Sequence, residues 1–240
     1  MDTIQINSIS TEKVISKSIS KSIDTFSVLL HHNMAVVGGF MGCYAILLRA
    51  DFLGNAQTAN LVFVLIAIFG GNIKEFLIRV IASLIYVASV ILFTIIKNKT
   101  RLNIKYIALI IDAMAVCILS FIPETANPII ALYPIFFAMA FQWNAFAGHY
   151  GYVSSTIFST NNLRQVSLSI GEYICDRDKK HLHKAKFFIG SLIGFHIGVA
   201  FAYLCVQNYG IKSIWFNLIP IFIGFLLEIR LQNLNSNCKK

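Results

Sequence analysis

The sequence predicts an all-α polytopic membrane protein with about six transmembrane helices and two short re-entrant half-helices, arranged as two inverted three-span repeats. Three observations predict this fold: the composition, the recurrence of long uncharged apolar runs, and a polar cluster that occurs twice. Apolar residues make up 57% of the 240-residue chain, charged residues only 13%, and the mean hydropathy is +0.70. These values lie outside the range of soluble domains.

Six apolar runs are long enough, with their flanking residues, to approach the ~20 residues that cross ~30 Å of hydrocarbon. They cover residues 35–48, 80–96, 106–122, 128–148, 187–207 and 213–227. We expect four regions: a tail at 1–25, a first membrane repeat at 26–123, a second membrane repeat at 124–232, and a tail at 233–240.

The first 25 residues are expected to be a cytoplasmic tail, because they are polar and hold no continuous apolar stretch ahead of Phe26. The first span would then target the chain to the membrane. Lysines recur in the tail every fourth residue beside isoleucines, at Lys13, Lys17, Lys21 and Ile15, Ile19, Ile23. The tail is either an amphipathic helix on an anionic leaflet or a disordered segment with a chance repeat.

Two shorter apolar segments, 60–71 and 162–171, begin with nearly the same polar cluster. The clusters read "QTANL" at 57–61 and "STNNL" at 159–163, and they lie 102 residues apart. A helix of ~12 residues with a rise of 1.5 Å reaches only about 18 Å, roughly half a bilayer. We therefore expect each segment to enter and leave the membrane on one side.

The distribution of basic residues supports this count of spans. With six spans, fifteen of the twenty basic residues fall on the cytoplasmic side, where Lys and Arg accumulate. They are Lys13, Lys17, Lys21, Lys97, Lys99, Arg101, Lys105, Arg177, Lys179, Lys180, Lys184, Lys186, Arg230, Lys239 and Lys240. If both short segments crossed, the cluster at 97–105 would move outside. Three spans per half also require the second half to enter inverted, a common plan in transport proteins.

The Thr and Asn side chains of the two clusters suit the first turn of a helix that begins inside the membrane. Their oxygens can accept hydrogen bonds from N–H groups that hydrocarbon would leave unsatisfied. In addition, two partly positive helix N-termini near the midplane would attract an anionic or polar solute. We therefore predict that Thr58, Asn60, Thr160 and Asn162 line a substrate pathway, while a purely structural capping role remains open.

The stretch "FFAMAFQWNAFAGHYGYVSSTIFSTNNLRQ" at 136–165 resembles the second signature of the YoaK-type family of bacterial membrane proteins, which is grouped under a domain of unknown function. The stretch "GGFMGCYAILLRADFLGNAQTANL" at 38–61 is similar, more loosely, to the first signature of the family. The chain departs from the family pattern at Ala59 and Asn161, which replace a middle Gly, and near Gly42, where an acidic residue is common. The resemblance implies about six spans and no settled substrate.

Two ionisable residues lie within predicted spans, where a charge costs roughly 2.5–3.5 kcal/mol on insertion scales. Asp112 lies in "IALIIDAMAVC", and His196 lies in "GSLIGFHIGVA" among glycines spaced for close helix packing. Each is either a coupling residue that carries a proton or cation, or a structural group bonded to a neighbouring helix. We expect neither a catalytic residue nor a cofactor.

Three further polar residues are candidates for the pathway. Gln142 and Asn144 face different sides of one helix, so one of them could face a solute. Arg164 follows the second cluster and has an apolar counterpart, Val62, in the first half. In a re-entrant segment Arg164 would favour an anionic substrate, whereas at the interface it would only meet lipid phosphates.

The remaining polar residues carry less weight. Five charged side chains near span ends are expected to anchor at the headgroups, namely Arg49, Lys74, Arg79, Lys212 and Glu228. The pair His181 and His183 lies among cations and is a poor metal site, and the five cysteines show no metal-like spacing. The formal charge of +9 reflects cytoplasmic loops and not nucleic-acid binding.

These observations favour a small-solute, possibly anionic, transporter or channel with a site near the midplane between the repeats. The alternative is a non-transporting membrane scaffold or accessory subunit, and an intramembrane enzyme using Asp112 and His196 is a third class. The expected partners are the lipid bilayer, a small polar or anionic solute, and a second copy of the chain. The expected location is the bacterial plasma membrane, with both termini in the cytoplasm.

Overall fold

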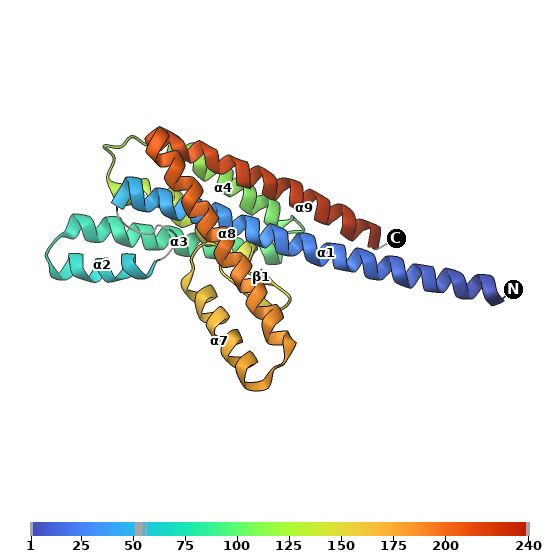
Figure 1. The fold of residues 1–240 in the computed structure, drawn as a ribbon. Coiled ribbons are helices and arrows are strands. Elements are labelled where there is room, and N and C mark those ends of the chain that lie inside the picture. The colour runs from blue at the N-terminus through green and yellow to red at the C-terminus, as the bar shows by residue number, and fades with distance from the viewer. Residues whose placement is uncertain (1, 51–54, 56, 239–240) are drawn as a thin grey trace.

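A computed structural model describes residues 2–50, 55 and 57–238, with side chains described from residue 18 onward except at 50 and 238. The described chain is almost entirely helical (Figure 1). The elements are α1 (Asp2–Ala45), the π-helix η1 (Ile46–Ala50), α2 (Thr58–Phe69), α3 (Ile73–Lys99), α4 (Ile104–Phe121), α5 (Pro128–Ala131), α6 (Tyr133–Ala145), β1 (Gly148–His149), β2 (Tyr152–Val153), α7 (Thr160–Asp176), α8 (Lys179–Tyr209), the 3₁₀-helix η2 (Gly210–Asn217) and α9 (Leu218–Cys238).

Five helical segments are long and apolar enough to cross a membrane. They are Ser18–Arg49, Ile73–Lys99, Ile104–Phe121, Pro128–Ala145 and Lys179–Asn237. The last segment combines α8, η2 and α9, which change direction at η2 (Figure 1). The turn begins at Gly210, whose φ of +53° suits a residue without a Cβ. An all-α membrane fold is therefore in place, with α8 and α9 as two arms of one segment.

Two helices lie at the centre of the packing. α1 packs along α8 and α9, which come from the far end of the sequence, while α6 packs against α3 and α4. In Figure 1 the orange α8 crosses the blue α1, and the red α9 runs beside α1 so that both termini lie at the same end. Each central helix is thus surrounded by helices from the other half of the chain.

The contact between α1 and α8 is made backbone to backbone. A Cβ added at Gly39 of α1 would meet the carbonyl of Phe195 in α8. In the opposite sense, a Cβ at Gly194 or Gly198 of α8 would meet the carbonyls of His32 and Val36 in α1. The predicted small-residue interface is therefore present, because each helix offers glycine where the other approaches most closely.

The two short helices differ from one another. α2 has 12 residues, is apolar after Asn60 and turns back into α3 through Gly70 and Gly71. α7 has 17 residues, alternates polar and apolar side chains and turns into α8 at Arg177, whose φ is 60°. The prediction of a short apolar segment thus holds for α2, whereas α7 extends to Asp176 and is amphipathic.

Two of the predicted headgroup anchors are buried instead. Arg49 is 7% exposed, and its Nη1 and Nη2 donate to the carbonyls of Pro123 and Ile122 at 2.9 Å. A guanidinium suits the unsatisfied carbonyls and negative dipole at the end of α4. Glu228 is 4% exposed and accepts from Asn103 Nδ2 at 2.6 Å. Both residues hold helices together.

Candidate functional site between the two short helices

A buried extended segment, residues 154–157, connects the small hairpin of β1 and β2 to α7. Its four residues are at most 1% exposed. The segment passes α1 so closely that a Cβ at Gly38 would meet the carbonyl of Thr156. Non-helical backbone at this depth needs internal hydrogen-bond partners, because hydrocarbon offers none.

Asn162 of α7 supplies several of these partners. Its Oδ1 accepts from the backbone N–H of Ser155 at 3.0 Å and from Ser154 Oγ at 3.1 Å, and its Nδ2 donates to the carbonyl of Ser155 at 2.7 Å. Asn162 is completely buried. The second cluster therefore ties α7 to the extended segment, and the side chain does not cap its own helix.

Two residues that were not among the sequence candidates extend this network. His31 Nε2 of α1 lies 2.9 Å from Ser154 Oγ, and Ser154 Oγ lies 3.1 Å from Ser191 Oγ of α8. Both His31 and Ser191 are buried. The positions of Ser191 and His31 in apolar helices gave no periodic signal that could separate them from packing residues.

Two amides secure the other side of the segment. Asn55 Nδ2 donates to the carbonyls of Gly38 and Ile157 at 2.7 and 2.8 Å. Gln142 Nε2 of α6 donates to the carbonyl of Met34 at 3.1 Å and to Thr156 Oγ1 at 3.0 Å. The predicted pathway residue Gln142 is thus engaged in holding α1 and the segment together.

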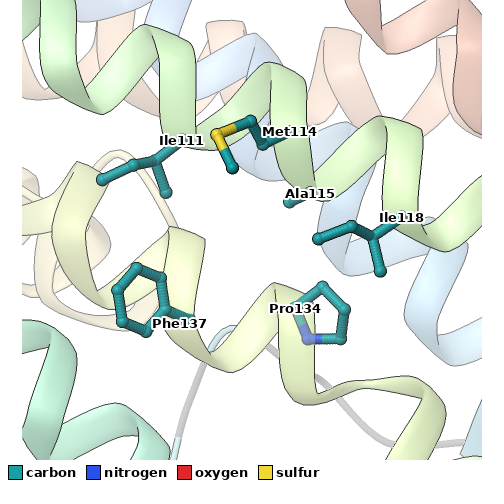
Figure 2. A pocket seen from close by; sticks show the side chains of 6 residues that line it. All are labelled: Ile111, Met114, Ala115, Ile118, Pro134 and Phe137. Carbon is teal, nitrogen blue, oxygen red and sulfur yellow. The ribbon is translucent and has the colours of Figure 1, made fainter.

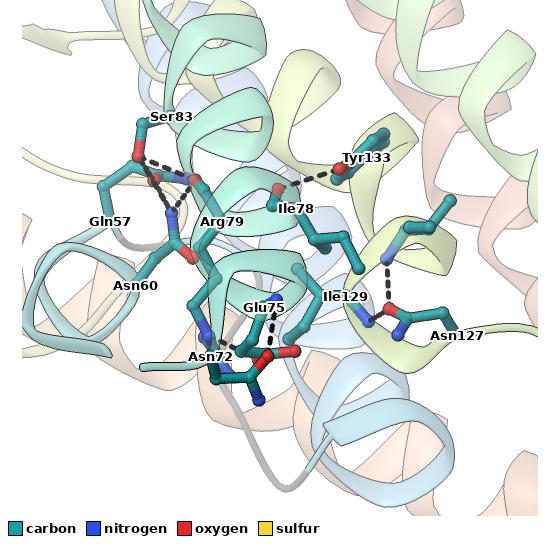
Figure 3. Close-up of polar contacts among 11 residues, drawn as sticks. Gln57, Asn60, Asn72, Glu75, Ile78, Arg79, Ser83, Asn127, Ile129 and Tyr133 are labelled. Atoms are coloured by element: carbon teal, nitrogen blue, oxygen red, sulfur yellow. Dashed lines mark hydrogen bonds and ion pairs between the residues drawn. The ribbon is translucent and has the colours of Figure 1, made fainter. Parts of the chain in front are cut away.

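The first cluster makes a corresponding tie to α3. Asn60 Nδ2 lies 3.0 Å from the carbonyl of Arg79, 2.9 Å from Ser83 Oγ and 3.0 Å from Gln57 Oε1. Figure 3 shows these contacts in the hairpin of α2 and α3. Asn60 is fully buried, although its Oδ1 has no partner in the described part of the chain. Here too the Asn side chain does not cap its own helix.

A cavity of about 420 Å³ lies where the two short helices begin. Thr58, the first residue of α2, and Thr160, the first residue of α7, both line it. The other lining residues are Asn55, Gln57, Leu61, Tyr86, Trp143 and Phe158. The two clusters, 102 residues apart, therefore open onto one space.

The cavity offers unpaired hydrogen-bonding groups. Neither Gln57 nor Ser159, the residues that precede α2 and α7, makes a side-chain cap bond, so the first N–H groups of both helices lack that partner. Among the described residues, Gln57 Nε2 and Asn55 Oδ1 of the cavity lining also have no hydrogen-bond partner. Asn55 is only 2% exposed, so its free oxygen is a buried acceptor.

Of the nine predicted pathway and coupling residues, Thr58 and Thr160 line the cavity and the other seven do not. Three of these seven are exposed or bonded within their own helix. Asn144 Nδ2 donates to the carbonyl of Ala140 in its own helix at 2.8 Å. Arg164 is exposed on the second turn of α7. His196 is also exposed, and its Nδ1 contacts the carbonyl of Leu192 at 2.8 Å, one turn back on α8.

Asp112 is fully buried in α4, and neither carboxylate oxygen has a hydrogen-bond partner among the residues the structure describes. The 3₁₀-helix η2 packs on α4 and carries two more buried side chains without a partner, Ser213 and Asn217. A buried acid without a partner is costly, so it calls for a reason beyond packing.

A second pocket, of about 260 Å³, lies between α4 and α6 (Figure 2). All six residues that line it are apolar: Ile111, Met114, Ala115, Ile118, Pro134 and Phe137. It offers no polar group to orient a solute. We therefore place the candidate site in the cavity at the start of the short helices.

Comparison with known proteins identifies the family of the chain and no function. No curated protein and no solved structure matches the chain. A family model described as "protein of unknown function (DUF1275)" matches residues 30–227, which include both clusters and the central segment. The chain therefore belongs to the DUF1275 family.

Proposed function

We propose that the protein transports a small polar or anionic solute across the membrane and binds it in the cavity between α2 and α7. The observation that carries this proposal is that Thr58 and Thr160 line the same cavity at the starts of two helices. Paired helix N-termini inside a membrane are a recurrent way to hold an anionic group. The YoaK-type resemblance of residues 136–165 is compatible with this proposal.

An inverted repeat of two three-span halves is part of the proposal. α1 of the first half packs on α8 and α9, and α6 of the second half packs on α3 and α4, which is the exchange that a pseudo-twofold axis would produce. In addition, Asn55 bonds to Ile157 across a separation of 102 residues, the offset of the two clusters. Equivalent positions touch each other only near such an axis.

Asp112 is the proposed coupling residue. Its buried carboxylate without a described partner could take up a proton or cation during transport. His196 was a second coupling candidate from sequence, and its exposure on α8 makes it the matched control. Asp112→Asn should abolish the dependence of flux on a proton or sodium gradient, whereas His196→Ala should leave it unchanged. A gradient dependence that survives in Asp112→Asn would remove this role.

The proposed location is the bacterial plasma membrane, with both termini in the cytoplasm. The N-terminal end of α1 and the C-terminal end of α9 lie at the same end of the molecule in Figure 1, as an even number of spans requires. Lys105 Nζ, in the first turn of α4 just after the basic residues 97–101, lies 3.7 Å from Glu228 Oε2 in the middle of α9. The positive-inside rule assigns this end to the cytoplasm.

Proteoliposome flux tests the proposal directly. Thr58→Val and Thr160→Val keep the side-chain shape but remove a hydroxyl from the cavity, so each should reduce uptake of a transported anion several-fold. Thr94→Val is the matched control, because Thr94 is exposed on α3 and bonds to Val90 of its own helix at 2.9 Å. Equal flux in all three variants, with normal thermal stability, would contradict the assignment of the cavity.

The alternative proposal is a non-transporting scaffold or accessory subunit. It is supported by the central network, in which Asn162 uses both ends of its amide to hold backbone together. This alternative expects no flux of any solute and cavity substitutions that change stability only. An intramembrane enzyme has less support, because Asp112 is buried whereas His196 is exposed and bonds within its own helix.

A further inference from the structure

We propose that the solute held between α2 and α7 is a small organic monocarboxylate that carries an apolar body and one hydrogen-bond donor. This inference rests on the proposed function and names the chemistry of the ligand. Each of the three parts of the ligand corresponds to a separate set of groups around the cavity.

The carboxylate corresponds to the starts of the two helices. Each helix N-terminus is equivalent to roughly half a positive charge, so two of them supply about one unit. The hydroxyls of Thr58 and Thr160 and the free Nε2 of Gln57 add donors at the same place. The eight residues that line the cavity include no acidic or basic side chain. A single negative charge is therefore matched, whereas a divalent anion would be only half compensated.

The apolar body corresponds to the aromatic wall of the cavity. Trp143 and Phe158 pack edge to face with their ring centroids 4.9 Å apart, and Tyr86 and Leu61 complete the apolar lining. The volume of about 420 Å³ lies within the range of sites that bind small organic molecules. An inorganic anion would leave most of this space and the aromatic wall unused, so an organic ligand fits better.

The hydrogen-bond donor corresponds to Asn55. Its Nδ2 is fixed by the carbonyls of Gly38 and Ile157, so the amide cannot rotate to present its nitrogen to the cavity. Its Oδ1 is a buried acceptor without a partner in the described chain. A ligand hydroxyl or amine that donates to this oxygen would relieve a buried unsatisfied group, and a site of this kind rejects analogues that lack the donor.

Tryptophan fluorescence can report binding in the full-length protein. The chain has two tryptophans, and Trp215 lies in η2, where it packs on Phe121. In Trp215→Phe protein the remaining signal comes from Trp143 in the cavity wall. The reference probe is phenyllactate, which has a carboxylate, an apolar ring and a hydroxyl. Phenylpropanoate lacks the hydroxyl, phenyllactamide lacks the charge, lactate lacks the ring, and sulfate is an inorganic dianion.

We expect phenyllactate to bind with the lowest Kd and each of the other four probes to bind at least about tenfold more weakly. Tight binding of phenyllactamide would contradict the requirement for a carboxylate. Equal binding of phenylpropanoate and phenyllactate would contradict the requirement for a hydrogen-bond donor. If the protein binds sulfate but not phenyllactate, the proposal of an organic ligand is wrong, whereas the proposed transport of an anion is unaffected. No signal from any probe would also overturn the inference, and the flux measurements would then judge the proposed function separately.

Gln57→Glu provides a variant designed to keep the fold. Glutamate retains an oxygen that can accept from Asn60 Nδ2 and Ser83 Oγ, the contacts of Gln57 in Figure 3. It replaces the free donor with a negative charge inside the cavity, so phenyllactate affinity should fall at least tenfold. Gln207→Glu adds the same charge at an exposed position of α8 and should have no effect. Unchanged affinity in Gln57→Glu would contradict the site.

Discussion

The two short helices begin with nearly the same polar cluster but differ over the rest of their length. After Asn60, α2 presents apolar side chains on most sides, and Phe69 is 88% exposed. After Asn162, α7 carries charged and polar residues and continues for five residues more than α2, to Asp176. The shared part is the starting turn with its Asn. The first turns of α2 and α7 therefore have a common role, whereas the rest of each helix lies in surroundings of its own.

The buried asparagines of the two clusters, Asn60 and Asn162, also differ in their hydrogen bonds. Asn162 pairs its carbonyl oxygen and its amide nitrogen with the extended segment, whereas Asn60 uses only its nitrogen. Asn162 fixes irregular backbone at the centre of the molecule, and Asn60 fixes one helix of a hairpin to the other. The second cluster should therefore matter more for stability than the first.

The largest expected effect is that of Asn162→Ala. It leaves the buried backbone N–H and carbonyl of Ser155 without their partner, and the unfolding free energy should fall by about 2–4 kcal/mol. Asn161→Ala is the matched control, since Asn161 makes a single 3.5 Å contact with the carbonyl of Val153. Thermal unfolding in detergent measures both. Equal losses would show that the network around Asn162 contributes nothing particular.

Asn60→Ala should have a smaller effect, about 1–2 kcal/mol, because the unpaired Oδ1 is removed together with the bonded nitrogen. Combination with Ser83→Ala in a double-mutant cycle measures the part of this loss that the contact to α3 contributes. If Asn60→Ala is more destabilising than Asn162→Ala, the proposal that Asn162 contributes more to stability than Asn60 is wrong.

Chemical labelling tests the different surroundings of the two helices. Cys175 is exposed near the polar end of α7, and Leu65 is 58% exposed on the apolar α2. In a background without the other cysteines, a membrane-impermeant maleimide should label Cys175 many times faster than Leu65→Cys in inside-out vesicles. Comparable rates at both positions would place the two helices in the same environment.

The smallest effect is expected at the turn between α7 and α8. The backbone N–H of Asp178 donates to Asp176 Oδ1, and His181 Nε2 contacts Asp176 Oδ2, so the pKa of the Asp176 carboxyl lies below its usual value. A lowered folded-state pKa stabilises the fold above the unfolded-state pKa, and this contribution is lost as the pH falls through the folded-state pKa. Asp176→Asn should lower Tm at neutral pH by on the order of 1 °C and leave Tm unchanged in acid. A full pH series of Tm tests this, and an equal difference at every pH would contradict the assignment.

Much of the membrane architecture could be predicted from the sequence, because hydropathy and charge depend on local composition. The apolar runs identified the helices, and the length of the segment at 60–71 predicted a short α2. Glycines spaced by four around His196 predicted the tight interface that α8 makes with α1. The clusters drew attention to Thr58 and Thr160, which line one cavity, and their role in a substrate pathway stays a prediction.

Other parts depend on contacts between distant segments, which no local pattern contains. The side chains of Asn60, Asn162 and Gln142 bond to other parts of the chain, which no local pattern shows, and their place in a substrate pathway stays a prediction. The aromatic residues of the lining, Tyr86 and Phe158, look like ordinary packing residues in sequence. Arg49 was predicted to reach lipid headgroups, which is wrong. Its burial depends on the position of the end of α4, which no local pattern contains.

The close approach of α1 to its neighbours has a mechanical consequence. α1 touches α8 at Gly39 and the extended segment at Gly38, with backbone on both sides. A helix held in this way cannot rotate or slide without separating main chains, so α1, α8 and residues 154–157 form a rigid frame. Alternation of access to the cavity would then require movement of α2 and α3, which carry the lining residues Thr58, Leu61 and Tyr86. The frame would keep one helix start fixed while the other moves.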